Sequence, residues 1–214
     1  MKLIQWMLAM AGVATLLAGC ASAPSPAALD AAALQAIKTS FRDQGIAKVD
    51  RLNQDRGQAA CSSDEAPSEA VAQAIVSEAE ASMKWPTGGQ YFGDWREGEK
   101  LAQNGRGMTW TDASAATKDN GGNCYNCHQI DKKEISFGTI GPSLYNFGKL
   151  RGVVDPASPA SKGMVEYTWG KIWNAKAYNA CSNMPRAGHM GIMTEAQVAD
   201  LVALLLDPKS PVNQ

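Results

Sequence analysis

The sequence predicts an all-α fold. Apolar residues recur at helical spacing near both ends of the chain, capping patterns precede two of these segments, and the middle lacks the two-residue alternation typical of strands. Hydrophobic residues make up 45% of the 214 residues and charged residues 19%, which is the composition of a globular protein and excludes disorder throughout. The 20 Lys+Arg and 21 Asp+Glu residues give a formal net charge of −1, which argues against a nucleic-acid-binding protein.

Residues 1–19 have the pattern of a lipoprotein-type signal peptide. A short positive segment precedes an almost wholly apolar run that is too short for a comfortable transmembrane helix. The run ends in Leu-Ala-Gly-Cys, which resembles the lipobox of bacterial lipoproteins. We therefore expect lipidation at Cys20, which would tether the chain to a membrane in the periplasm. Two alternatives stay open, cleavage after Ala23 and an uncleaved N-terminal anchor, and both also place the chain outside the cytoplasm, where disulfides form.

Residues 20–28 and 29–89 are expected to form a tether and a helical extension. The tether is rich in small residues, and the extension is rich in alanine. Apolar residues share one helical face in a first segment of the extension and recur at every fourth position in a second. They are Leu29, Ala33, Leu34, Ile37 and Phe41 in the first segment, and Val71, Ile75, Ala79 and Met83 in the second.

Two prolines mark the ends of the second helical segment. We expect Pro67 to lie in its first turn and Pro86 to end it, because proline fits the start of a helix and interrupts its interior. Residues 57–67 are predicted to form a loop that carries Cys61. Apart from this cysteine, the extension carries no residue with an evident chemical role.

Residues 90–214 are expected to form the main domain, with one helix at its start and another near its end. Each helix begins with a capping-box pattern, formed by Asp94 and Glu97 in the first and by Thr194 and Gln197 in the last. Gly98 would allow the two helices to approach closely. Few regular elements are evident between them, so we expect a bound group to complete the core.

The segment Cys124-Tyr125-Asn126-Cys127-His128 carries the chemistry. C-x-x-C-H is the attachment signature of haem c, in which the two thiols add to the vinyl groups and the histidine binds the iron. A zinc site would need four ligands, and the few remaining cysteines and the other histidine lie at irregular spacings. A thioredoxin-like dithiol usually follows a strand, and none is predicted here. One motif therefore indicates one covalently bound haem c, attached at Cys124 and Cys127 and ligated by His128.

Met184 is the expected sixth ligand of the iron. It is followed by Pro185, lies 56 residues after His128, and sits in an irregular polar loop shortly before the terminal helix. A thioether presented to iron explains a methionine in such a loop, although a single methionine is more often core filler. The other candidate ligands are Met164, His189, Met190 and Met193.

A Gly-Pro-Ser-Leu segment begins at Gly141, 13 residues after His128. The carbonyl group of Pro142 is placed to accept a hydrogen bond from the ring of His128, which would fix the tautomer and the plane of the imidazole. The alternative interpretation is a simple turn. We expect Pro142 to orient His128.

These parts together resemble a class I cytochrome c, with an N-terminal helix, a C-x-x-C-H motif, a G-P-x-L segment, a Met-Pro loop and a C-terminal helix. The chain resembles the SoxX family more closely. These proteins are the monohaem cytochromes of thiosulfate-oxidising Sox systems. Residues 90–214 carry this likeness strongly and residues 29–89 loosely. Its most specific parts are the Asn-Met-Pro-Arg segment at 183–186 and the DPKSPVN tail.

The resemblance implies an electron-transfer subunit without catalytic residues of its own. Members of the family pair with SoxA, a cytochrome c that carries the active site of a heteromeric L-cysteine S-thiosulfotransferase. The complex joins thiosulfate oxidatively to a cysteine of the carrier SoxYZ, and a soluble cytochrome c accepts the electrons. The resemblance also implies that Cys124 and Cys127 attach the haem and that His128 and Met184 ligate its iron. The lipobox at Cys20 departs from the family's usual periplasmic release.

Two other functions stay open. One is a stand-alone periplasmic electron carrier without a catalytic partner. The other is a haem enzyme or ligand sensor, in which Met184 would be displaced from the iron by a ligand. Copurification with a partner cytochrome would distinguish a Sox subunit from a stand-alone electron carrier.

Counting the cysteines gives a further expectation. When one cysteine is assigned to lipid and two to haem, Cys61 and Cys181 remain. In an oxidising compartment we expect them to form a disulfide, which would tie the extension to the loop of Met184. The alternative is a free and redox-active Cys181.

Overall fold

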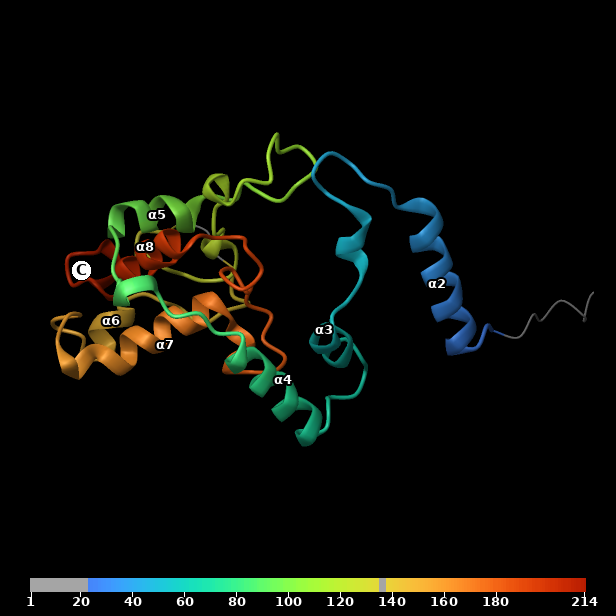
Figure 1. The fold of residues 1–214 in the computed structure, drawn as a ribbon, viewed down its shortest axis with the longest axis horizontal. Coiled ribbons are helices and arrows are strands. Elements are labelled where there is room, and N and C mark those ends of the chain that lie inside the picture. Colours follow the sequence, from blue (N-terminus) through green and yellow to red (C-terminus); the bar gives the residue numbers. More distant parts are fainter. Residues whose placement is uncertain (1–22, 135–137) are drawn as a thin grey trace, which may run out of the picture. The chain divides into compact units, whose positions relative to one another are not determined.

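Figure 1 shows the fold in a computed structural model, which describes residues 23–134 and 138–214. The predicted signal peptide of residues 1–19 and the predicted lipidation site Cys20 lie outside the described residues. The chain divides into two compact units, of which the first ends at Arg42 and the second at Gln214. Within the described ranges the regular elements are helices, with one isolated bridge and no strand, so the predicted all-α class is confirmed.

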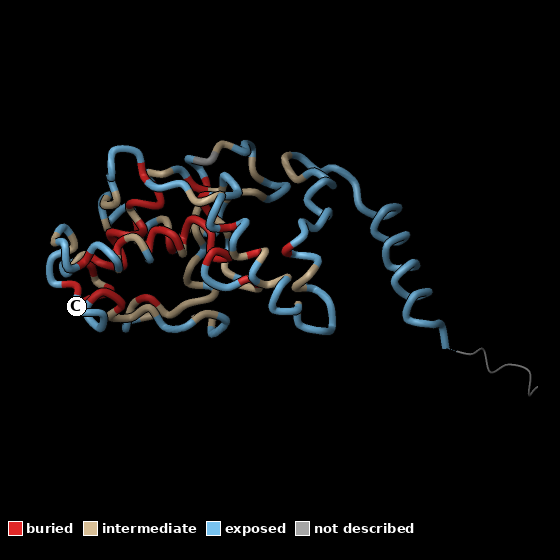
Figure 2. The backbone as a smooth tube through the Cα atoms, turned by 60° about the horizontal axis from the view of Figure 1, so that its bottom comes forward, coloured by how far each residue is buried: buried red, intermediate tan, exposed pale blue. Residues whose placement is uncertain are grey.

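The first unit contains α2 (Pro26–Ser40). The side chain of Ser25 accepts a hydrogen bond from the amide of Ala28, and Pro26 occupies the first helical position. The helix therefore begins inside the predicted tether. None of its residues is buried (Figure 2), and the predicted apolar face is exposed.

The first α-helix of the second unit is α3 (Arg56–Cys61), which overlaps the loop predicted for residues 57–67. Asp55 and Gln58 form a capping box, in which each side chain accepts a hydrogen bond from the backbone amide of the other. This capping starts a short helix, so Cys61 is the last residue of a helix and the loop prediction for it is wrong. The sequence analysis overlooked the capping pattern because it assigned the helix signals only to the longer apolar segments.

The next helix, α4 (Glu69–Ala81), is the second predicted segment of the extension. Its N-cap is Ser68, whose hydroxyl accepts a hydrogen bond from the amide of Val71. Pro67 therefore precedes the cap and does not lie in the first turn. The helix ends at Ala81, before Pro86 is reached.

Helices α5 (Trp95–Gln103) and α8 (Glu195–Leu206) cross at Gly98. A Cβ atom at Gly98 would lie 2.1 Å from the carbonyl oxygen of Asp200, so the crossing requires glycine, and the predicted close approach is confirmed. The capping box of Thr194 and Gln197 is present at the start of α8.

The predicted capping box of α5 is only half formed. Asp94 caps the helix by accepting a hydrogen bond from the amide of Arg96. Glu97, however, pairs with Lys100 at 2.6 Å. The amide of Asp94 already donates to the carboxylate of Asp200 at 2.8 Å, so this donor does not need Glu97.

The core of the second unit forms around α8, which packs with α6 (Phe147–Leu150) and α7 (Lys162–Trp173). Figure 2 shows the buried segments concentrated in this part of the chain. The rings of Trp169 and Trp173 on α7 stack with centroids 5.8 Å apart. The largest fully buried apolar side chains are those of Trp169, Ile130, Leu204, Leu206, Val198, Val202 and Val212.

Short 3-10 helices connect these elements. They are η1 (Val49–Leu52), η2 (Thr87–Gly89), η3 (Thr117–Asp119), η4 (Cys124–Asn126), η5 (Pro159–Ser161), η6 (Ala175–Ala177) and η7 (Pro211–Asn213). Among the helices of the described ranges, none has the length and apolar character needed to cross a membrane.

The boundary between compact units follows Arg42, whereas the sequence analysis placed a boundary after residue 89. The end of the extension is bonded to the main domain. The indole N–H of Trp169 donates to the carbonyl of Lys84 at 2.9 Å, and the side-chain amide of Asn174 donates to the hydroxyl of Ser82 at 3.1 Å. These contacts join residues about ninety positions apart, and local composition does not reveal contacts at such sequence separations.

Candidate functional site

The C-x-x-C-H segment forms a single tight turn in the second unit. Asn123 precedes η4 in the left-handed conformation, and the amides of Cys127 and His128 both donate to the carbonyl of Cys124, at 3.1 and 2.9 Å. The turn holds the side chains of Cys124, Cys127 and His128 close to one another. Cys124 and Cys127 are not in a disulfide, so both thiols are present for covalent attachment.

Cys124 lies against tightly packed neighbours. A Cβ atom at Gly122 would lie 2.9 Å from both Cys124 Sγ and Met193 Cε, so a side chain at this position would require these two side chains to shift. Desolvation by the surrounding atoms raises the pKa of the Cys124 thiol to about 12.

The structure places Pro142 beside His128, as the sequence analysis expected. His128 Nδ1 lies 2.6 Å from the carbonyl oxygen of Pro142, and with the proton on Nδ1 the imidazole donates this bond. Nε2 then carries the free lone pair that a metal ion binds. A Cβ atom at Gly141 would lie 2.2 Å from His128 Cε1, so glycine is needed for the loop to approach the ring this closely.

Backbone hydrogen bonds hold this loop against the motif. The amide of Gly141 donates to the carbonyl of Cys127 at 2.8 Å, that of Gly138 to Tyr125 at 3.0 Å, and that of Leu144 to Gln129 at 2.7 Å. The histidine side of the site is therefore built from contacts between residues that are close in sequence.

Met184 is half-buried and packs against the hydrophobic core. Its amide donates to the hydroxyl of Ser182 at 3.3 Å, within an irregular loop that ends where the amides of Ala187 and His189 bond to α7. The other candidate ligands differ in their surroundings. Met193 is buried in the core beside Gly122, Met164 is half-buried on α7, and Met190 and His189 are exposed.

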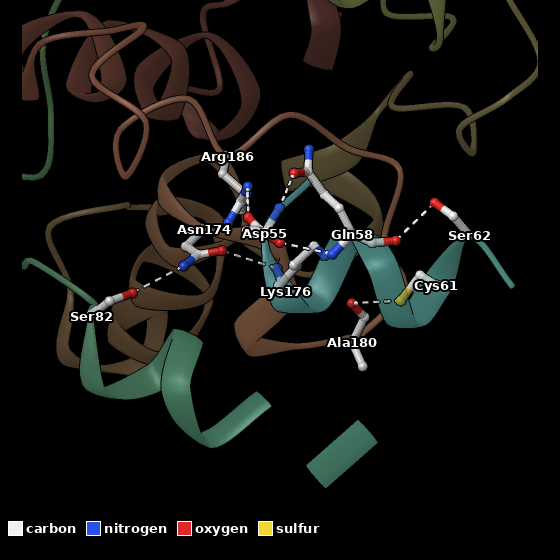
Figure 3. Close-up of polar contacts among 9 residues, drawn as sticks. All are labelled: Asp55, Gln58, Cys61, Ser62, Ser82, Asn174, Lys176, Ala180 and Arg186. Carbon is white, nitrogen blue, oxygen red and sulfur yellow. Dashed lines mark hydrogen bonds and ion pairs between the residues drawn. The ribbon is translucent and has the colours of Figure 1, made fainter. Parts of the chain in front are cut away.

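Two contacts attach the Met184 loop to the extension, and Figure 3 shows one of them, between Asp55 and Arg186. Cys61 and Cys181 are joined in a disulfide with their Cα atoms 5.4 Å apart, which is the pairing that cysteine counting indicated. Arg186 pairs with Asp55, with Nη2 and Oδ2 separated by 2.5 Å. The sequence analysis missed this ion pair, although the capping pattern at Asp55 was a signal that this segment has defined structure.

The residues present fit a covalently attached haem. Two unpaired thiols, an imidazole with a fixed tautomer and a half-buried thioether provide both the attachment points and the kinds of ligand that haem iron takes. In addition, the indole Nε1 of Trp173 is buried and has no hydrogen-bond partner among the described residues. A buried donor of this kind is stabilised when a bound group supplies an acceptor.

Comparison with known proteins identifies the family. The profile of the family described as Cytochrome c matches residues 96–208, which is just over half of the chain. A protein of Aquifex aeolicus (strain VF5), named "Uncharacterized lipoprotein", is 36% identical over 167 residues, which span 75% of this chain and 73% of that protein.

Proposed function

The chain belongs to the cytochrome c family and carries one covalently attached haem c, so its activity is electron transfer; we propose that it is the electron-transfer subunit of a SoxAX-type thiosulfate-oxidising complex. The hydrogen bond between His128 Nδ1 and Pro142 carries the electron-transfer part of this proposal, because it prepares Nε2 as a permanent iron ligand. The resemblance of the Met184 loop and of the C-terminal tail to SoxX supports the finer assignment.

In this proposal each residue of the site has one task. Cys124 and Cys127 would attach the haem covalently, His128 Nε2 and Met184 Sδ would hold its iron, and the carbonyl of Pro142 orients His128. When bound, the haem supplies reversible one-electron redox chemistry. Histidine and methionine together leave no coordination position open, and the thioether favours the reduced state, so the site is suited to passing electrons and not to binding substrate.

The catalytic centre lies on the partner, SoxA. The thiol of a carrier cysteine on SoxYZ loses its proton and forms an S–S bond with the terminal sulfur of thiosulfate, which releases two electrons and one proton. A soluble cytochrome c accepts the electrons one at a time. The present chain contributes no catalytic residue to this reaction.

We further propose that the chain acts in the periplasm and is lipidated at Cys20. The Leu-Ala-Gly-Cys segment supports this, and so does the word lipoprotein in the name of the Aquifex relative. Mass spectrometry of the N-terminal peptide from membranes tests it. A peptide that starts with an acylated Cys20 is expected, whereas one that starts after Ala23 contradicts lipidation.

The function is tested with the holoprotein purified from its native source. We expect a second cytochrome c to copurify, and we expect thiosulfate to reduce the haem of this chain only when both that partner and the carrier are added. Carrier protein with its cysteine alkylated is the control and should give no reduction. Reduction by thiosulfate without the partner, or isolation of the chain without any partner, would contradict the Sox assignment and favour a stand-alone carrier.

The iron ligand is tested separately by Met184→Ala, with Met190→Ala as the matched control because Met190 is exposed. Met184→Ala should abolish the weak long-wavelength iron–sulfur absorption band of the oxidised protein and allow rapid binding of carbon monoxide to the reduced protein. Met190→Ala should leave both unchanged. Persistence of the band in Met184→Ala would contradict the axial assignment.

A further inference from the structure

We propose that α3 is a brace for the loop that carries the iron ligand, and that Asp55 and Arg186 are positioning residues for Met184. This inference rests on the proposed role of Met184 as the sixth ligand. The disulfide alone would hold one side of the loop. The ion pair holds the other side, and both contacts start from the same six-residue helix.

The two contacts flank Met184 closely. Cys181 lies three residues before it and Arg186 two residues after it. On the extension, Asp55 is the N-cap of α3 and Cys61 is its last residue, so the two attachment points are separated by one rigid helix about 9 Å long. The loop is therefore fixed on both sides against a spacer of constant length.

The carboxylate of Asp55 serves both the helix and the loop (Figure 3). Its Oδ1 accepts a hydrogen bond from the amide of Gln58 at 2.7 Å, which caps α3, and its Oδ2 pairs with Arg186 at 2.5 Å. The Arg186 side chain is 14% exposed and that of Asp55 42%, so this pair is shielded from water on the arginine side. A partly buried and hydrogen-bonded pair restrains its groups more than an exposed pair does.

A second ion pair of α3 provides a comparison. Arg56 and Glu78 join α3 to α4 at 2.6 Å, but their side chains are 63% and 58% exposed and neither touches the Met184 loop. Removing this pair therefore affects the attachment of the brace to α4 and leaves both flanks of the loop in place.

The brace, α3, also contacts the main domain. Lys176 on η6 is buried, and its Nζ lies 2.7 Å from the position of a Cβ atom at Gly57, so the end of this side chain contacts α3. Asn174, next to η6, donates to the hydroxyl of Ser82 at the end of α4. The extension thus covers the segment that leads into the Met184 loop.

This arrangement bears on the iron–sulfur bond. A thioether is a weak ligand, and a loop without regular structure loses conformational entropy when it presents one to iron. If both flanks are already fixed, much of that entropy is lost on folding, and Met184 remains close to the iron against competition from other ligands. The brace therefore favours the closed, six-coordinate state.

The test measures binding of imidazole to the oxidised holoprotein, with the long-wavelength band as the readout of Met184 ligation. Asp55→Asn is the main variant, because asparagine can still cap α3 but carries no charge. Arg186→Gln removes the other partner. We expect each to raise the affinity for imidazole by about twofold to fivefold. The double variant should bind imidazole with nearly the same affinity as the single variant with the larger effect, because both changes break the same contact.

Glu78→Gln is the matched control and should bind imidazole as the wild type does. Circular dichroism and urea unfolding report whether each variant is folded. Wild-type imidazole affinity in folded Asp55→Asn and Arg186→Gln would overturn the brace, and so would an equal increase in Glu78→Gln. Persistence of the band in Met184→Ala is the distinct outcome that overturns the ligand assignment of the proposed function.

Discussion

Replacing Cys61 and Cys181 together with serine should destabilise the second unit strongly, because the disulfide closes a long loop. The two cysteines are 120 residues apart in sequence. In the chain-entropy model, a cross-link over this separation stabilises the folded state by about 5 kcal/mol at 25 °C, mainly by restricting the unfolded chain. Compared with the 5–15 kcal/mol that is typical of folded domains, this is a large fraction of the stability.

The measurement is urea unfolding of the holoprotein at neutral pH, followed by tryptophan fluorescence. With a typical urea dependence of about 2 kcal/mol per M, a loss of about 5 kcal/mol lowers the midpoint by about 2.5 M. The alanine pair Cys61→Ala and Cys181→Ala is the control for the change in side chain, and both pairs should shift by similar amounts. A shift below about 0.5 M in both pairs would refute the loop-closure reasoning.

Three further predictions concern single positions. Gly141→Ala should displace the His128 ring, because the added Cβ would lie 2.2 Å from Cε1. It should lower the free energy of unfolding by about 1–3 kcal/mol and change the visible spectrum. An unchanged spectrum would contradict the close approach of Gly141 to the ring. Gly98→Ala should cost about 2–4 kcal/mol in urea unfolding, since its Cβ would lie 2.1 Å from a backbone oxygen of α8, whereas Gly163→Ala, with open space around it, should have little effect. Burial raises the pKa of Asp55, but the Gln58 amide and the Arg186 guanidinium outweigh burial and hold that pKa below its ordinary value. The ionised Asp55 therefore stabilises the folded state at pH values above the pKa that it has in the unfolded chain. This stabilisation is lost as the pH falls through the lower pKa of the folded state. Asp55→Asn should therefore lose less stability on acidification than the wild type.

The helices at the two ends of the main domain could be predicted because their signals are local. Asp94 and Thr194 cap α5 and α8, and an apolar face follows each cap, so a few adjacent residues specify each helix. Gly98 was informative because a glycine inside a helix costs stability unless close packing requires it.

Helix α7 could not be predicted in the same way. It is buried on several sides, with Val165, Thr168, Trp169, Gly170, Ile172 and Trp173 all inaccessible. Its polar side is narrow, with Lys162 and Glu166 paired on it, so its sequence carries only a weak period. Its β-branched residues and glycines lower the helical propensity further. Its helical state depends on tertiary packing, which a local sequence pattern does not report.

The candidate site shows the same division between local and distant information. The C-x-x-C-H motif and Pro142 are within 20 residues of one another, so their contact was predicted from spacing. The ion pair of Asp55 and Arg186 joins residues 131 apart, and no feature of either sequence segment identifies the other. Cysteine counting suggested the disulfide only because few cysteines remained once haem and lipid were assigned.

This division also describes how the two sides of the site are held. The histidine side depends on hydrogen bonds within residues 124–144, which remain as long as that short segment is folded. The side of Met184 depends on α3, across separations of 120 and 131 residues, and therefore on the packing of the whole second unit. Proteins open locally in contiguous units of different stability, so contacts within one short segment and contacts between distant segments respond to different changes. In the proposed site, the methionine side is therefore the part whose geometry responds to changes in α3, and α3 is best understood as a support of the Met184 loop.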